Sequence, residues 1–281
     1  MFTLLDSGPY ECGETPNWVK QEHELYWVDA ASHKIFKHDL QTGSTQTFKP
    51  DVPVSALRID SHGNFFILSM WGLYRWSPQP AGSGTVLAGS DYLNRSGTIR
   101  FNDGIDAGNG LFIAGAFDKS DLYNGNGYLF LLDTEGMCRL IDNHLFVPNG
   151  IALSKDKSRL FMSEMYQNRV LAYEVDWEKE SFSKSSIHIT ITEDEGKPDG
   201  LLCDSSNNLW VAHWRGWRLT RYDKNGNRNK TVNTPFASPT CPCFAEKSET
   251  ALFVSTATLE LTPEELEKST NPGGMFKVNL Q

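Results

Sequence analysis

The sequence lacks any long run of apolar residues, and its start, MFTLLDSGPY, has no basic segment followed by an apolar stretch. A membrane-spanning helix needs about 20 consecutive apolar residues, and a secretory signal needs basic residues before its apolar core. We therefore expect no membrane span, no membrane partner and a cytoplasmic location.

Cysteine is scarce: there are five, an odd number, and none forms a Cys-x-x-Cys pair. This is too few for the disulfide framework of a small secreted domain, so a reducing compartment fits best. Cys241 and Cys243 flank a proline, but no matching Cys or His pair lies nearby to complete a metal or redox site. We expect this pair to be buried thiols.

Positive charge is also in short supply, with 26 Lys and Arg against 35 Asp and Glu and a formal net charge of −9. Such a molecule repels polyanions, so nucleic acid is not expected as a partner. Most of the acidic residues are expected on the solvated surface. A few that turn inward can bind a cation.

Aromatic and apolar residues are plentiful, with 16 Phe, 9 Tyr, 8 Trp and a hydrophobic fraction of 39%. This composition suits strands and a packed core and excludes global disorder. One strand pattern recurs along the chain, in the segments ELYWVD 24–29, NFFILS 64–69, GLFIAG 110–115, RLFMSE 159–164, NLWVAH 208–213 and ALFVST 251–256. The repeat interval, 40 to 49 residues, is typical of propeller blades. We predict an all-β fold, a six-bladed β-propeller that forms a single domain over residues 1–281.

Each repeat has a short strand before the apolar segment, a paired strand after it and an outer strand beyond. The sixth repeat runs out of chain after GMFKVNL, so the segment FTLLD near the N-terminus is expected to supply the missing outer strand and close the ring. One insertion interrupts this repeat. Its sequence, Thr262-Pro263-Glu264-Glu265, predicts a short capped helix.

The turns that enter the inner strands carry the candidate site. Counting back from the apolar segments, Glu14 and Asn149 each lie eleven residues before the second residue of their segment, and Asp199 lies ten before. Each is an ordinary turn residue when taken alone. Because equivalent positions in different blades point toward one axis, we expect two carboxylates and an amide to converge at the channel mouth, where they suit a hard divalent cation. The alternative is a hydrogen-bonded polar plug without a metal.

Arg100 and Asn102 are two residues apart on the approach to the third blade, so they share a face while Phe101 points away. We expect them to bind the hydroxyl or carbonyl groups of a polar ligand. The turn from Ala116 to Asn126 is long and is a candidate lid. In the fifth blade, His213, Trp214 and Trp217 occupy the corresponding turn; a structural role is expected for the histidine, and the tryptophans are candidates for an aromatic wall.

At these residues the sequence resembles the senescence marker protein, gluconolactonase and luciferin-regenerating enzyme family. The resemblance covers most of the chain and rests on six motifs: GETPNW 13–18, RFNDG 100–104, PNGIALS 148–154, PDGLLCD 198–204, LWVAHWRGWRLTRYD 209–223 and NPGGMFKV 271–278. It implies a six-bladed propeller with one divalent cation, which is Ca, Zn, Mn, Mg or Fe(II), held by Glu14, Asn149 and Asp199. It also implies substrate contacts from Arg100 and Asn102.

The sequence departs from this family in the third-blade turn, AFDKSDLYN, where members place a substrate-contacting acid. A direct alignment falls near Ser120, and Asp118 or Asp121 is the acid available to substitute. The resemblance implies a hydrolase that opens sugar lactones, with Asp199 either as the base that activates water or as a group that only positions it. A phosphotriesterase or paraoxonase-like esterase and a non-catalytic metal-binding propeller are the alternatives.

Overall fold

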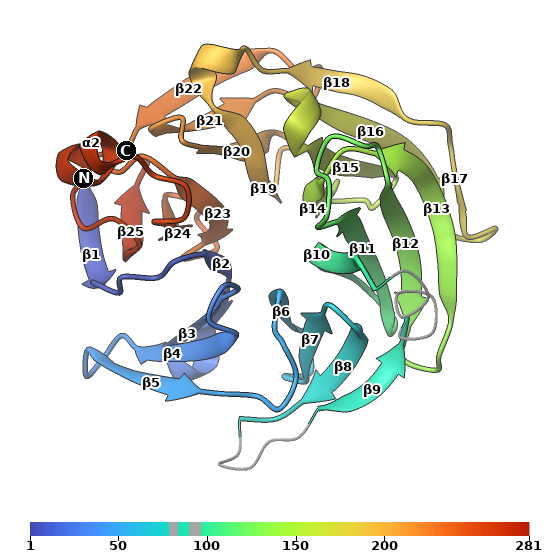
Figure 1. Cartoon of the computed structure of the whole chain (residues 1–281), viewed down its shortest axis with the longest axis horizontal. Coiled ribbons are helices and arrows are strands. Elements are labelled where there is room, and N and C mark those ends of the chain that lie inside the picture. Colours follow the sequence, from blue (N-terminus) through green and yellow to red (C-terminus); the bar gives the residue numbers. More distant parts are fainter. Residues whose placement is uncertain (79–83, 90–96, 281) are drawn as a thin grey trace.

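The structure is a computed structural model that describes residues 1–78, 84–89 and 97–280. Within these ranges the strands form six antiparallel sheets, which stand around a central axis as the blades of a propeller (Figure 1). The predicted all-β, six-bladed architecture is confirmed.

The inner two strands of each blade follow the predicted repeat. The innermost strands line the axis: β2 (Gly13–Val19), β6 (Ala56–Ile59), β10 (Ile99–Gly108), β14 (Pro148–Leu153), β19 (Lys197–Cys203) and β23 (Pro239–Phe244). The apolar segments form the second strands: β3 (Glu24–Asp29), β7 (Phe65–Ser69), β11 (Leu111–Asp118), β15 (Arg159–Glu164), β20 (Leu209–Trp214) and β24 (Ala251–Thr256). These second strands are almost wholly buried, which explains why they read as apolar runs without alternation.

The outer two strands complete each sheet. The third strands are β4 (Lys34–Asp39), β8 (Gly72–Trp76), β12 (Gly127–Asp133), β16 (Arg169–Asp176), β21 (Arg218–Tyr222) and β25 (Met275–Asn279). The outermost strands are β5 (Ser44–Phe48), β9 (Thr85–Ala88), β13 (Cys138–Leu145), β18 (Ser186–Thr190), β22 (Arg228–Asn233) and β1 (Phe2–Asp6). A two-residue strand, β17 (Ser181–Phe182), extends the fourth blade beside the end of β16.

The N-terminal strand closes the ring as predicted. β1 pairs antiparallel with β25, and Phe2 lies opposite Val278 and Leu4 opposite Phe276. The two chain ends therefore lie side by side in the sixth blade (Figure 1). This pairing covers the edge that the last blade would otherwise leave exposed.

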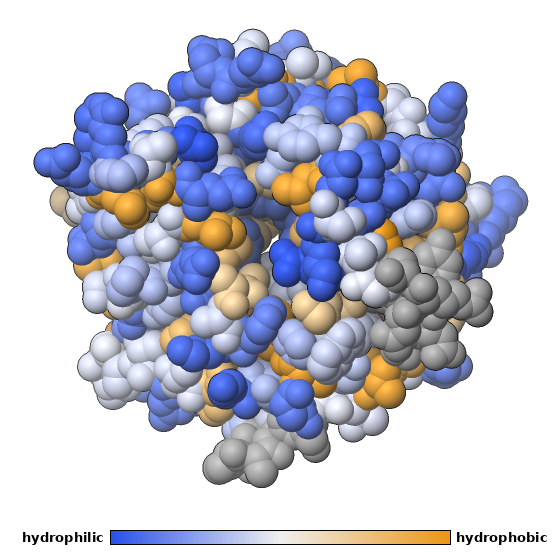
Figure 2. All heavy atoms as spheres, viewed as in Figure 1, coloured by the Kyte–Doolittle hydropathy of each residue, from blue (hydrophilic) through white to orange (hydrophobic). Residues whose placement is uncertain are grey.

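The hydrophobic core lies between neighbouring blades. One cluster joins Ile113 and Leu131 of the third blade to Leu160 and Met162 of the fourth, and all four side chains are fully buried. Comparable clusters join the other neighbours. Because each sheet is held on both faces, the inner strands keep fixed positions around the axis, where Figure 2 shows a hollow.

The predicted helix insertion is confirmed in the sixth blade. Helix α2 (Pro263–Lys268) begins after Thr262, whose hydroxyl accepts a hydrogen bond from the Glu265 backbone N–H at 3.2 Å. The described residues also include 3-10 turns at η1 (Lys20–Glu22), η2 (Met165–Gln167) and η3 (Glu193–Glu195). In the part of the chain that the structure describes, no helix is long and apolar enough to cross a membrane.

All five cysteines lie in the described ranges and are free thiols. Cys241 is buried as expected, whereas the side chain of Cys243 is partly exposed to solvent. Burial raises the pKa of the Cys241 thiol well above its usual range, so this side chain behaves as a small apolar group.

Candidate metal centre and substrate pocket

Glycines let the inner strands of neighbouring blades approach one another closely. β14 and β19 each contain a bulge, at Asn149-Gly150 and at Asp199-Gly200, where the pairing with the second strand shifts. A Cβ atom on Gly150 would lie 2.2 Å from the backbone oxygen of Asp199, and one on Gly200 would lie 2.6 Å from that of Thr240. Only glycine fits these contacts, which bring Asn149 and Asp199 together near the axis.

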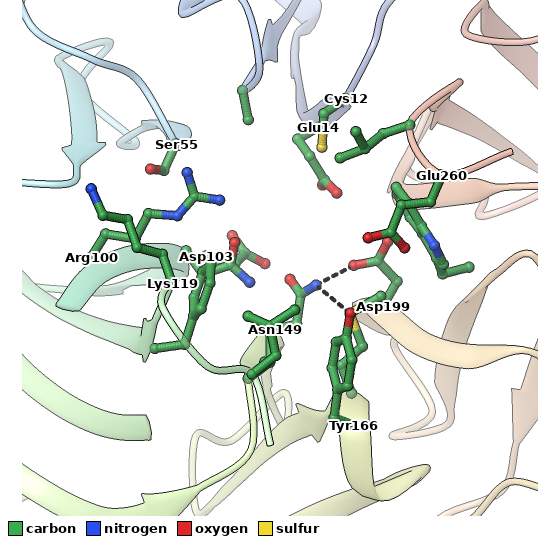
Figure 3. A pocket seen from close by; sticks show the side chains of 18 of the residues that line it. Cys12, Glu14, Ser55, Arg100, Asp103, Lys119, Asn149, Tyr166, Asp199 and Glu260 are labelled. Carbon is green, nitrogen blue, oxygen red and sulfur yellow. Dashed lines mark hydrogen bonds between the residues drawn. The ribbon is translucent and has the colours of Figure 1, made fainter. Parts of the chain in front are cut away.

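A cavity of about 320 Å³ opens near the propeller axis, beside Asn149 and Asp199 (Figure 3). Its polar lining includes Glu14, Asn149 and Asp199. An apolar cluster surrounds the opening and contributes the side chains of Phe117, Leu122, Val147, Met165, Tyr166 and Trp214. Concave sites with an apolar wall and a few convergent polar groups are typical of small-molecule pockets.

The three predicted metal ligands meet in this cavity. The Asn149 amide nitrogen donates a hydrogen bond to Asp199 Oδ1 at 2.5 Å and contacts Met165 Sδ at 3.6 Å. Glu14 extends into the same cavity from the first blade (Figure 3). Its Oε2 accepts only a long hydrogen bond, 3.3 Å, from the backbone N–H of Thr15. The structure thus brings these three side chains together, and their role as ligands stays a prediction.

Burial dominates the electrostatics of the two carboxyl groups. Asp199 is 1% exposed, and its Oδ2 has no hydrogen-bond partner among the described residues. Burial raises the pKa of Asp199 well above its usual range, and the negative charge of Asp103 raises it further. Burial also raises the pKa of Glu14, with the charges of Asp199 and Asp103 adding to the effect. For Glu14, the backbone N–H of Thr15 and the positive charge of Arg58 oppose this rise in pKa.

Asp103, in contrast, has a counterion. Arg58 of the second blade donates to the Asp103 carboxylate at 2.6 Å and to the backbone oxygen of Gly104 at 2.5 Å. Burial raises the pKa of Asp103, and Arg58 opposes that rise. Sequence reasoning missed both residues, although Asp103 stands inside the RFNDG motif beside the predicted Asn102.

The side chains of Glu14, Asn149 and Asp199 fit a divalent cation. Two carboxylates and an amide supply the oxygen donors that hard cations prefer, and the unpartnered Oδ2 belongs to a buried Asp199 carboxyl group whose ionised form needs a positive partner. Among the described residues, no group of three or more His, Cys, Asp or Glu could hold a metal ion. A three-residue cation site here therefore requires the Asn149 amide oxygen as a ligand in addition to the two carboxylates.

The strand register places Glu14, Asn149 and Asp199 at equivalent positions of their blades. Gly13 lies opposite Asp29, the last residue of its repeated apolar segment, and Glu14 follows it just before the pairing shifts. Pro148 and Pro198 likewise lie opposite the last residues of their segments, and Asn149 and Asp199 follow them at the shift. The turn from β19 to β20 has one residue fewer between its last paired residues than the turn from β14 to β15, which accounts for the count of ten residues instead of eleven.

Arg100 and Asn102 share a face of β10, as predicted, and both line the cavity. Phe101 between them is fully buried in the core. The Arg100 guanidinium lies 4.8 Å from the centre of the Phe117 ring, and burial lowers its pKa from the usual value. The Asn102 amide nitrogen donates to the backbone oxygen of Pro148 at 3.2 Å.

Asp118 and Ser120 do not line the cavity. Asp118 accepts hydrogen bonds from the backbone and the hydroxyl of Ser120, at 2.9 and 2.6 Å, and from the Asn124 amide at 3.0 Å. These bonds, the Ser120 hydroxyl first, lower the pKa of Asp118 to about 2. Lys119 of this turn lines the cavity beside the apolar Phe117 and Leu122, and sequence reasoning missed it. Substrate contact by Asp118 or Ser120 stays a prediction.

The fifth-blade turn places its residues in three different settings. His213 is fully buried, its Nδ1 lies 2.9 Å from the Glu195 backbone oxygen, and burial lowers its pKa to about 4. Trp214 lines the cavity, whereas Trp217 lines a separate surface depression beside α2. The histidine is thus a core residue, and the aromatic wall has one of the two predicted tryptophans.

Comparison with known proteins identifies the family. The model of the SMP-30/Gluconolactonase/LRE-like region matches residues 12–258. The chain belongs to this family, as its motifs indicated.

The similar proteins match along almost the whole chain. Regucalcin of Gallus gallus is 27% identical over 281 residues, covering 98% of this chain and 92% of its own. A pentonolactonase of Haloferax volcanii is 28% identical over 248 residues, covering 87% and 81%. The crystal structure of regucalcin from Agrobacterium tumefaciens, described as a calcium-binding protein, superimposes with a TM-score of 0.88 at 24% identity and covers 98% and 92% of the two chains.

Proposed function

We propose that this protein is a divalent-cation-dependent lactonase that opens sugar lactones to the corresponding sugar acids. The observation that carries the proposal is the convergence of Glu14, Asn149 and Asp199 in one cavity, where a buried Asp199 oxygen has no partner among the described residues. The family and the pentonolactonase relative support a lactone as the substrate class.

Glu14, the Asn149 amide and Asp199 are the residues that would hold the cation. Bound there, a divalent cation would supply Lewis-acid polarisation of the lactone carbonyl. Asn149 orients Asp199 through its hydrogen bond to Oδ1, which leaves Oδ2 free to take a proton from the attacking water. Water oxygen bonds to the carbonyl carbon, the ring ester C–O bond breaks, and the proton ends on the released hydroxyl group.

Arg100 and Asn102 have the task of positioning the substrate. Both line the cavity beside the cation-binding side chains, and both carry N–H groups that can donate to sugar hydroxyls. A polar wall of this kind favours a polyhydroxylated lactone over an apolar aryl ester or a phosphotriester. It therefore argues against a paraoxonase-like activity on the same scaffold.

A second candidate function is cation binding without catalysis. It is favoured by one observation, the description of the Agrobacterium relative as a calcium-binding protein. The two functions share Glu14, Asn149 and Asp199 and differ only in turnover.

A pH-drop assay separates these functions. Aldono-lactones, aryl esters and a phosphotriester are each incubated with the protein, before and after treatment with a chelator and again after divalent cations are restored. Lactonase function predicts acid release from the lactones that the chelator abolishes and the cation restores. Binding of cations with no turnover of any compound supports the binding propeller instead.

A further inference from the structure

Two cationic side chains line one wall of the substrate cavity. Arg100 and Lys119 both belong to the third blade and lie together on one side of the cavity in Figure 3. Glu14, Asp199 and Glu260 lie across the cavity from them. Asp103 also lies on the side of the two cations, but its charge is balanced by Arg58. The cavity therefore has unpaired positive charges on one side and carboxyl groups on the other.

The strand register explains why Lys119 faces the cavity. Arg100 lies opposite Phe117 in the β10–β11 pair, and the backbone N–H of Lys119 bonds to the oxygen of Thr98 at 3.0 Å, which continues the pairing. Opposite and diagonal neighbours in an antiparallel pair share a face, so Arg100, Phe117 and Lys119 lie on the cavity side. Asp118 falls on the other face.

These two cations have no acidic partner. Within residues 1–78, 84–89 and 97–280, no ion pair or side-chain hydrogen bond involves Lys119 or the guanidinium of Arg100, whose Nε is buried without an acceptor. The obvious counterions are engaged elsewhere, Asp103 by Arg58 and Asp118 by Ser120. Lys119 is exposed, but the buried part of the Arg100 guanidinium makes its unpaired charge costly unless an anion accompanies it.

We propose that Arg100 and Lys119 bind an anionic group, a carboxylate or a phosphate, carried by the lactone at a distance from its reacting carbonyl. This inference rests on the proposed lactonase function. The anion is attracted to the third-blade wall and repelled by Glu260, whereas a bound divalent cation would offset the charges of Glu14 and Asp199, so the charge pattern favours the orientation in which the anionic group faces the third blade. The preferred substrate class is then acidic sugar lactones rather than neutral ones.

The test compares kcat/KM for three lactones. Gluconolactone is neutral, glucarolactone carries a carboxylate, and phosphogluconolactone carries a phosphate. The wild-type protein is expected to prefer at least one acidic lactone by ~10-fold or more, because a charge-assisted contact is worth about that factor. The arm that is preferred identifies the anionic group.

The variant Lys119→Gln removes one of the two charges. It is expected to lower the ratio of acidic to neutral kcat/KM by ~10-fold, mainly through KM. The matched control is Lys155→Gln, which removes an exposed lysine in the turn between β14 and β15, outside the residues that line the cavity. An unchanged ratio in Lys119→Gln, an equal change in Lys155→Gln, or a wild-type preference for gluconolactone would overturn the proposal.

A binding measurement keeps the proposal testable if no lactone is turned over. The open-chain dianion glucarate and the monoanion gluconate are titrated calorimetrically into wild type and Lys119→Gln. Tighter wild-type binding of glucarate that is lost in the variant supports the anion site even when the lactonase function has failed. Equal affinities for the two acids in both proteins contradict it.

Discussion

The Asn149 amide nitrogen lies 2.5 Å from Asp199 Oδ1, across the seam between the fourth and fifth blades. Gly150 makes this approach possible, because any side chain there would collide with the Asp199 backbone. The bond satisfies one carboxylate oxygen and leaves the other, Oδ2, without a partner in the described residues. The contact thus fixes the direction in which Asp199 presents its free oxygen.

The variant Asp199→Asn should lose lactone turnover by at least ~100-fold, since general-base catalysis contributes about that much or more. The measurement is kcat on a lactone that the wild-type protein opens, with circular dichroism to show that the fold is retained. Glu178→Gln, which neutralises an exposed acid far from the cavity, serves as the control. Near-normal hydrolysis by Asp199→Asn would remove the proposed role.

Glu14→Gln should weaken binding of a divalent cation by ~10-fold or more, because ligand charge sets cation affinity. Glu260→Gln is the matched control: it removes the same charge from the same cavity but leaves the three proposed ligands intact. Calorimetric titration with calcium or manganese gives both affinities. Equal weakening in the two variants would mean that Glu14 acts through general attraction and not as a ligand.

Cation affinity should also fall as the pH is lowered. The pKa values of Glu14 and Asp199 are raised, chiefly by burial, so a cation must displace protons that these groups hold at pH values where ordinary carboxyls are ionised. The dissociation constant, measured at several pH values in buffers of different ionisation enthalpy, should decrease with rising pH while protons are released. A pH-independent affinity without proton release would contradict the burial of these groups.

Asn102→Ala should raise KM for the lactone by ~10-fold through the loss of one substrate hydrogen bond. The control Asn64→Ala deletes an amide that bonds to Asp60 on a surface turn, at 2.8 Å. Steady-state kinetics of both variants distinguish a substrate contact from a general loss of stability. Unaltered KM in Asn102→Ala would leave this residue with only its structural bond to Pro148.

His213 should make the fold sensitive to mild acid. Burial lowers its pKa from 6.5 to about 4, so protonation favours the unfolded chain, and the stability of the folded state falls as the pH drops through this interval. Between pH 7 and about pH 5, the wild-type protein should lose ~2 kcal/mol more unfolding free energy than His213→Asn. Denaturant titrations of both proteins at the two pH values measure this difference, and parallel losses would contradict it.

Much of the fold could be predicted from the sequence because the same burial pattern recurs in every blade. The second strands are buried on both faces, so their apolar segments stand out at blade spacing, and the closing strand Phe2–Asp6 follows from the one blade that lacks an outer strand. Asn149 and Asp199 could be located for a related reason. Each precedes a glycine that the close packing of inner strands requires.

The remaining features depend on details that a residue count does not contain. Lys119 faces the cavity because β11 continues its pairing with β10 past the expected end of the strand. Its neighbour Asp118 points to the opposite face, because successive side chains of a strand alternate between the two faces. Arg58 reaches Asp103 from another blade, over 45 residues of sequence. Such contacts follow from the ring arrangement and not from local pattern.

Anomalous diffraction from crystals grown with manganese shows directly whether Glu14, Asn149 and Asp199 hold a divalent cation. We predict one manganese peak within bonding distance of the Glu14 and Asp199 carboxylates and the Asn149 amide oxygen, and its disappearance in Glu14→Gln. A protein that opens lactones in a manganese-dependent manner, yet shows no peak at these three side chains or binds the ion elsewhere, would contradict the proposed metal centre.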